Sequence, residues 1–506
     1  MPDAWADATA AFTAADLTRS LLVGALVLLV SVAAVRLSVR SGLPTLLLYL
    51  AIGVGLGEAG LGIRFDSAEL TQVLGYAALI LILAEGGLTT EWSAIRRSVA
   101  PAAVLSTLGV VVSVVVVGAA ARFILQLPWS TALLVGAILS STDAAAVFSV
   151  LRTVPLPRRL SGLLEAESGF NDAPVVILVL AFAMDSASGA APHPWWELLF
   201  HASLELAGGA VVGLALGWLG AAALRRVAGA SSGLFSIGVI ALVVLAYAVA
   251  ATANASGFLA AYLSALVLGN LGLPHRSAVH AFSTALGSLA QIGLFVLLGL
   301  LAAPSRFVEQ IVPAIVIGLV LLLVGRPLSV LVSLTPFRVP WRDQVFLSWA
   351  GLRGAVPVVL ATVPATLGTG GTEWIFDLVF MLVVIFTVVQ APSLPWVSRR
   401  LGVAEGVRQV GLSLESTPLE ELGAEVLHVV IGAESRLHGV EVFELRLPAG
   451  ANVTLLVRGG KSVVPQGHTG LRHGDQLLVV TTAEARRATE RRFRAIDQGG
   501  RLAGWS

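Results

Sequence analysis

Between residues 17 and 397 the chain is a succession of apolar segments, each long enough to cross a lipid bilayer as a helix. A membrane-spanning helix needs about 20 consecutive apolar residues, and about 13 such segments can be placed between Leu17 and Val397. Charged residues make up only 12% of the chain and its mean hydropathy is +0.88, whereas a soluble domain carries about 25% charged residues. The sequence therefore predicts an all-α polytopic membrane protein, with its membrane domain at residues 17–400.

The arginines of the connecting loops predict the orientation of these segments. One set of alternating loops carries pairs of arginines, from Arg36 and Arg40 at its start to Arg399 and Arg400 at its end. The other set carries only Arg19, Arg64, Arg122 and Arg306. Because basic residues collect on the cytoplasmic side, we expect residues 1–16 to be a short external segment and the C-terminus to be cytoplasmic. The expected location is a cell membrane.

A change of composition after Arg400 marks a second domain. Charged residues become frequent and the apolar runs shrink to the length of strands at 426–431, 451–457 and 476–480, followed by a helix at 484–496. We expect a linker at residues 401–411 and a small α+β cytoplasmic domain at residues 412–506.

Composition and motifs also exclude several functions. The chain has no cysteine, which rules out disulfides, thiolate metal sites and cysteine nucleophiles. Its net charge is +1 without a strong basic stripe, so we expect no nucleic acid partner. Nucleotide-binding loops and metalloprotease, serine hydrolase and potassium-filter motifs are not found in the sequence, and we expect no cofactor and no transition metal.

Ionisable residues inside membrane segments are costly and by default mark an ion or proton path. The richest segment, 160–185, carries Glu167 and Asn171 on one helical face, with Ser168 and Asp172 on the adjacent stripe. Two acids, an amide and a hydroxyl are hard oxygen ligands, which suit an alkali cation or a proton. The alternative is a polar seam between packed helices.

Two other segments carry the residue pattern of interrupted helices. Residues 140–143 place four polar side chains, including Thr142 and Asp143, in an apolar run. Residues 351–354 place two glycines around Arg353. Broken helices at the membrane midplane coordinate ions in secondary transporters. The alternative for Asp143 is a solvated position near the end of its segment.

The buried arginines need partners, because an uncompensated charge in a membrane is expensive. Glu167 is the natural partner of Arg326, which would leave Asp172 free to titrate. A purely structural pairing is expected for at least one of Arg326 and Arg353.

Residues 141–143, 167–172 and 351–354 together resemble the bacterial sodium/hydrogen exchanger family, in its Asn-Asp branch of monovalent cation:proton antiporters. Residues 257–270 and 290–295 look like those of its potassium/proton antiporter subgroup. Residues 412–482 resemble a TrkA-C (RCK-C) ligand-sensing domain.

This resemblance implies inverted repeats, two crossed interrupted helices and a homodimer, with Asp172 carrying either the cation or the proton. Around it would stand four further ion-binding residues: Thr142, Asp143, Ser168 and Asn171. Glu167 would pair with Arg326 or Arg353, with Arg326 favoured. The resemblance also implies electroneutral one-for-one exchange of K⁺ for H⁺, since Asn171 stands where the electrogenic branch has a second aspartate and an arginine replaces its lysine.

Other functions stay open at this point. A Na⁺-selective antiporter would use the same chemistry. A cation channel gated by the TrkA-C domain would need a filter that the sequence lacks. An intramembrane hydrolase would need two opposed aspartates, for which Asp143 and Asp172 are candidates. The expected partners are K⁺ or Na⁺, H⁺ and the lipid bilayer, with a small-molecule regulator at the C-terminal domain; we expect a secondary transporter and not an enzyme.

Overall fold

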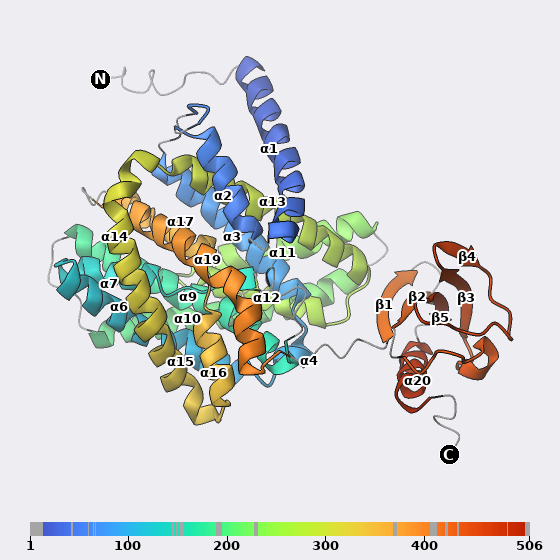
Figure 1. Cartoon of the computed structure of the whole chain (residues 1–506). Helices are drawn as coiled ribbons and strands as arrows, with labels where there is room; N and C mark the ends of the chain where they lie inside the picture. Colours follow the sequence, from blue (N-terminus) through green and yellow to red (C-terminus); the bar gives the residue numbers. More distant parts are fainter. Residues whose placement is uncertain are drawn as a thin grey trace. The chain divides into compact units, whose positions relative to one another are not determined.

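The computed structural model divides the chain into two compact units, residues 1–404 and residues 405–506 (Figure 1). It describes residues 14–41, 44–58, 60–63, 65, 67–143, 146–147, 150, 156–188, 195–226, 231–367, 372–404, 412–419, 424–432, 435–482 and 484–500. Residues 1–13 of the predicted external segment and 405–411 of the predicted linker lie outside the described residues.

The first unit is helical, and nine of its helices within the described residues are long and apolar enough to cross a membrane. They are α1 (Ala14–Ser41), α3 (Ala68–Thr89), α5 to α6 (Val99–Ile124), α9 (Arg158–Ser188), α10 (Trp195–Arg226), α11 (Ser232–Thr252), α13 (Arg276–Leu301), α14 to α15 (Pro304–Leu334) and α19 (Glu373–Leu401).

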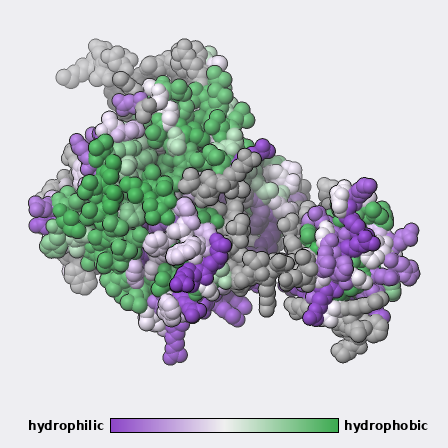
Figure 2. Space-filling view, in the orientation of Figure 1, coloured by the Kyte–Doolittle hydropathy of each residue, from purple (hydrophilic) through white to green (hydrophobic). Residues whose placement is uncertain are grey.

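Four shorter apolar helices complete this set in the described part of the unit: α2 (Thr45–Leu56), α7 (Trp129–Ile138), α12 (Gly257–Asn270) and α17 to α18 (Ala355–Thr366). Together the long and short segments correspond one for one to the predicted membrane segments. Large apolar side chains also cover the outside of the unit, as Figure 2 shows for one face, and Val308 is 73% exposed. Such a surface is stable in lipid and not in water, so the predicted polytopic fold is confirmed.

Helix packing brings together two membrane segments that each contain an irregular turn. A π-helical turn, η2 (Leu105–Gly109), joins α5 (Val99–Val104) to α6, and a second one, η4 (Leu321–Gly325), joins α14 to α15 (Arg326–Leu334). The Ser329 hydroxyl donates to the Gly109 carbonyl at 2.8 Å, which ties α15 to η2. Because π-helical turns shift the following side chains around the helix, η4 sets the direction of Arg326.

The second unit is a five-stranded sheet of strand order β1-β2-β5-β3-β4 with the helix α20 (Arg486–Gly499). The strands are β1 (Leu412–Leu419), β2 (Ala424–Ile431), β3 (Ala451–Arg458), β4 (Lys461–Val463) and β5 (Gln476–Thr482), and neighbouring strands are antiparallel. Phe493 and Ile496 of α20 are buried in one core with β-strand residues such as Leu427 and Leu477. The predicted α+β domain is confirmed, although the two edge strands β1 and β4 were missing from the prediction. Pro418 lies in β1, where an edge strand tolerates a residue that cannot donate to the ladder.

Candidate functional site

The polar run that follows α7 interrupts this helix, as the sequence predicted. The Ser140 hydroxyl donates to the Ala137 carbonyl at 2.7 Å, and residues 141–143 are not helical. The Asp143 carboxylate then accepts a hydrogen bond from the Ala146 N–H at 3.2 Å. Side-chain bonds to the local backbone therefore replace the helical ones, which is the reason why such residues break a helix.

The second interruption separates α16 (Trp341–Trp349) from α17 (Ala355–Leu360), and the two interruptions meet. The Asp143 N–H donates to the Leu352 carbonyl at 2.9 Å. Arg353 donates from Nη1 to the carbonyls of Ser140 at 3.2 Å and Ser141 at 2.7 Å. A cation is favourable at a helix C-terminus because the last carbonyls have no intrahelical partner. Arg353 thus compensates the broken end of α7.

The two glycines around Arg353 make this contact sterically possible. A Cβ on Gly354 would lie 1.9 Å from Asp143 Oδ2, and one on Gly351 would lie 2.7 Å from Arg326 Nε. Neither glycine has a positive φ. The close approach of neighbouring side chains, and not backbone conformation, therefore explains both glycines.

Helix α9 contributes the buried carboxylate that faces Arg326. Arg326 Nη1 lies 2.5 Å from Glu167 Oε1 and Nη2 lies 2.8 Å from Oε2, and the two side chains are only 5% and 3% exposed. The backbone carbonyl of Glu167 accepts from the Ser106 hydroxyl at 3.1 Å. Such a bidentate pair cancels both charges in the membrane interior.

A chain of hydrogen bonds leads from this pair to Asn171. The Thr142 hydroxyl donates to Glu167 Oε1 at 3.1 Å, and Asn171 Nδ2 donates to Thr142 Oγ1 at 2.6 Å. The Asn171 Oδ1 atom is buried and has no hydrogen-bond partner among the described residues. A buried acceptor without a partner is costly, so this oxygen is a candidate ligand for a cation.

A second buried carboxylate of α9, Asp172, is 7% exposed and accepts a hydrogen bond from the Ser141 hydroxyl at 2.9 Å. In the described part of the chain, the hydrogen bonds of Arg326 and Arg353 go to other acceptors. Ser168 lies on α9 one turn before Asp172 and is partly buried. A buried carboxylate that lacks a cationic partner has to hold a proton or a cation.

The structure thus brings together most of the predicted site residues on α9 and at the two interruptions. Asp143 differs from the others, because its Oδ1 caps the backbone at Ala146. Its side chain is partly buried.

Sequence reasoning missed three polar partners. Ser141, the donor to Asp172, stood in the polar run at 140–143 and was not selected as a site residue. Asp343 is buried and pairs with Arg159. Asp377 is 2% exposed and lies 2.8 Å from Arg306 Nε. Asp377 fell inside the last predicted membrane segment, so the rule that an acid in a membrane needs a partner could have identified it.

A helical membrane unit in which two interrupted segments meet beside a buried carboxylate is the architecture of a secondary transporter. The chain belongs to the sodium/hydrogen exchanger family, whose transmembrane model matches residues 22–400. The TrkA-C domain model matches residues 426–494. Both resemblances expected from the motifs are confirmed, and the chain is a multi-pass membrane protein.

Curated relatives cover most of the chain. The K(+)/H(+) antiporter NhaP of Alkalimonas amylolytica is 36% identical over 94% of this chain and 85% of its own length. The K(+)/H(+) antiporter NhaP2 of Shewanella oneidensis is 35% identical over 91% of this chain and 80% of its own length. Among solved structures, the sodium proton antiporter MjNhaP1 of Methanocaldococcus jannaschii matches with a TM-score of 0.63 and 22% identity, over 74% of this chain and 99% of its own. That last likeness bears on the fold alone.

Proposed function

We propose that this protein is a secondary antiporter that exchanges a monovalent cation for H⁺, and that K⁺ is the favoured cation. The observation that carries the proposal is the contrast between two buried acids on one helix. Glu167 is neutralised by Arg326, whereas Asp172 accepts only a neutral hydroxyl among the described contacts. The relatives named as K(+)/H(+) antiporters support K⁺, and Na⁺ is the alternative.

In this mechanism Asp172 binds a proton or a cation, and the two compete. Hydroxyl, amide and carboxylate oxygens from Ser141, Asn171 and Asp172 are suited to a partly dehydrated alkali cation. Moving the empty, charged carboxylate across the membrane barrier is costly, so only the loaded site changes sides. Thr142, Asp143 and Ser168 complete the proposed ion site.

The balance of charge supports electroneutral exchange of one cation for one proton. Arg326 and Glu167 cancel each other's charge, so this pair adds no net charge to the site. Asn171 adds an amide and no second ionisable group next to Asp172. Asp143, the other carboxylate of the proposed site, accepts the hydrogen bond from the Ala146 N–H. We therefore assign the exchange to Asp172 alone, which accepts a single positive charge from either side.

The proposed topology has the N-terminus outside and the C-terminus in the cytoplasm, in the inner membrane of a bacterial cell. The alternation of loop arginines supports it. We also propose that the protein is a homodimer and that a small molecule acts on the TrkA-C domain. It is a transporter and not an enzyme.

Proteoliposomes that contain a pH-sensitive dye test the proposal. K⁺, Na⁺ or Li⁺ is added in turn to wild type, to Asp172→Asn and to Glu309→Gln, which removes an exposed acid on α14. We expect a cation-driven pH change that is lost in Asp172→Asn, kept in Glu309→Gln and unaffected by clamping the membrane potential. Cation flux without proton movement would indicate a channel, and full activity of Asp172→Asn would remove Asp172 from its role.

A further inference from the structure

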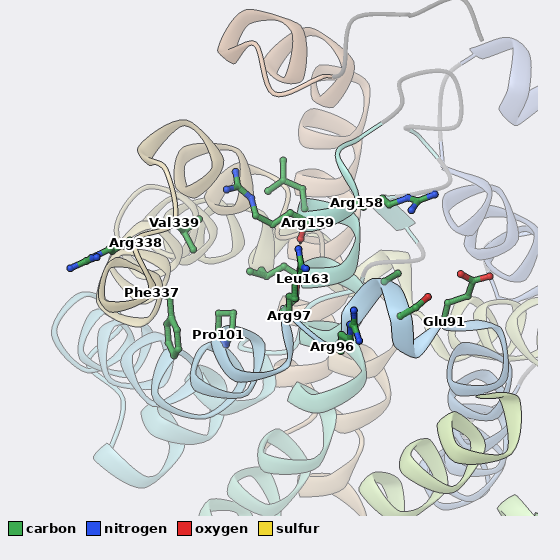
Figure 3. A pocket seen from close by; sticks show the side chains of 14 residues that line it. Glu91, Arg96, Arg97, Pro101, Arg158, Arg159, Leu163, Phe337, Arg338 and Val339 are labelled. Atoms are coloured by element: carbon green, nitrogen blue, oxygen red, sulfur yellow. Dashed lines mark hydrogen bonds between the residues drawn. The ribbon is translucent and has the colours of Figure 1, made fainter. Parts of the chain in front are cut away.

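A cavity of about 610 Å³ lies where α4 (Trp92–Ile95), α5, α9 and η5 (Thr335–Phe337) come together (Figure 3). Its polar lining is dominated by arginine. Among the described lining residues there are five arginines and one acid, Glu91; the arginines are Arg96, Arg97, Arg158, Arg159 and Arg338. Glu91 and Arg338 lie at opposite ends of the cavity in Figure 3.

Most of this positive charge has no counter-charge in the described part of the chain. Arg159 pairs with Asp343. Among the described residues, no ion pair or hydrogen bond is found for the other four guanidinium groups, which are all exposed. The tendency of arginine to collect on the cytoplasmic side explains its abundance here. It does not explain why five of these side chains surround one cavity, where like charges repel one another.

The rest of the lining is mostly apolar, with Ser93 and Ser98 as further polar residues. Pro101, Leu163, Phe337 and Val339 contribute to it. The volume lies within the range of about 300–1,000 Å³ that is usual for small-ligand sites. Guanidinium groups bind phosphate oxygens in bidentate geometry, and basic pockets on the cytoplasmic side of membrane helices bind anionic headgroups.

We propose that this cavity is a binding site for a phosphate-bearing anion. Arg96, Arg97 and Arg158 would bind the phosphate, and the apolar wall would hold the organic part next to it. Two sources share this chemistry: the headgroup of an anionic phospholipid and a free phosphate compound. The site is separate from Asp172, so its existence does not depend on the transport function proposed above.

An anion in this cavity would connect the elements that hold the ion site. Helix α9 starts at the cavity and carries Glu167 one turn after Leu163. The turn η2, which follows α5, carries Ser106, and its hydroxyl donates to the Glu167 carbonyl. Helix α15, which leads to η5, begins with Arg326. Bound phosphate would therefore fix the relative positions of the three elements that meet at the Glu167–Arg326 pair.

The test uses the full-length protein in nanodiscs of pure phosphatidylcholine. Phosphate or pyrophosphate is titrated in one arm at constant ionic strength, and phosphatidylglycerol replaces part of the phosphatidylcholine in the other. The readouts are the thermal unfolding midpoint and hydrogen exchange of peptides that cover 92–101 and 158–163. The cavity variant is Arg97→Gln with Arg158→Gln, and the matched control is Arg226→Gln with Arg400→Gln, which removes two exposed arginines on the same predicted side.

In wild type and control, we expect an anion to raise the unfolding midpoint and to protect both peptides from exchange. In the cavity variant, we expect an apparent affinity on the order of tenfold weaker, because charge-assisted bonds are lost. A response to phosphatidylglycerol alone identifies a lipid headgroup, and a response to phosphate or pyrophosphate alone identifies a free phosphate compound. If the cavity variant folds poorly, Arg97→Lys with Arg158→Lys keeps the charge and is expected to bind more weakly than wild type. Equal responses of wild type and cavity variants, or no response in either arm, would overturn the proposal.

Discussion

Arg326 donates two parallel hydrogen bonds to Glu167, with Nη1 2.5 Å from Oε1 and Nη2 2.8 Å from Oε2, although 159 residues separate the two in the sequence. Both side chains are buried, so each charge depends on the other for compensation. Of the two buried acids of α9, Glu167 is thus neutralised, and Asp172 is the one that we propose for exchange.

Removing one member of this pair is expected to be more harmful than removing both. Glu167→Gln leaves a buried guanidinium without its counter-charge, and breaking a buried pair in this way costs about 3–5 kcal/mol. Combining Glu167→Gln with Arg326→Gln removes the unpaired charge, so the double variant should be more stable than the sum of the single variants indicates. Unfolding of the purified proteins in detergent measures this difference. Strictly additive effects would show that the two charges are not coupled.

The Thr142 hydroxyl connects Asn171 to Glu167, and its loss should therefore weaken both contacts. Thr142→Val keeps the shape of the side chain but leaves the buried Asn171 amide without its 2.6 Å acceptor. An unsatisfied buried group costs about 1–3 kcal/mol, so we expect lower stability and slower cation-driven proton movement in proteoliposomes. Thr142→Ser keeps the hydroxyl and is the control. Unchanged stability and transport in Thr142→Val would show that these hydrogen bonds are not needed.

Gly354 is expected to tolerate no side chain. A Cβ there would collide with the Asp143 side chain, whose Oδ2, Cγ and Cβ atoms would all lie within 2.7 Å of it. Gly354→Ala should displace Asp143 from the Ala146 N–H and reduce transport at least several-fold. The control is Gly293→Ala on α13, where a Cβ meets nothing within 4 Å. There alanine should be neutral or more stable by up to about 1 kcal/mol, since it is the better helix former. Normal transport by Gly354→Ala would mean that the junction of the two interruptions is not tightly packed.

In the second unit, Asp475 should make stability depend on pH. Burial raises the pKa of this carboxyl, but the hydrogen bonds from the Arg458 guanidinium and the Arg472 N–H, together with the charges of both arginines, outweigh burial and lower its pKa overall. Because the pKa is lower in the folded state, the ionised carboxyl stabilises the fold at pH values above its unfolded-state pKa of about 3.9. This stability is lost as the pH falls through the folded-state pKa. In the full-length protein, the protection of the β3 and β5 amides against hydrogen exchange should therefore fall below about pH 4.

The variant Asp475→Asn separates this effect from general acid unfolding. Because the Arg458 side chain is 34% exposed, we expect a cost of about 2–3 kcal/mol, at or below the lower end of the range for fully buried pairs. The β3 and β5 amides of this variant should already be weakly protected against exchange at neutral pH. Their protection should change less than in wild type as the pH falls from 6 to below about 4. A variant with the same pH profile as wild type would show that another group is responsible.

The sequence alone predicted the membrane segments and the two interruptions, because each depends on local properties. The length of an apolar run decides whether a helix can span lipid, and the polar run at 140–143 satisfies the backbone locally. The α+β unit after the membrane domain was equally visible in its short apolar runs. The edge strands β1 and β4 could not be predicted in this way. They are defined by their pairing with β2 and β3, and not by apolar periodicity.

The tertiary structure decided the partners of the charged groups. Sequence reasoning could state that Arg326 and Arg353 each needed a carboxylate or a helix end, but only packing assigned Glu167 to the first and the carbonyls of Ser140 and Ser141 to the second. It also determined that Ser141 donates to Asp172 and that Asp143 accepts from the Ala146 N–H. Hydrophobicity acts on each segment separately and can be read along the chain, whereas hydrogen bonds and ion pairs act over about 3 Å and depend on which segments come together.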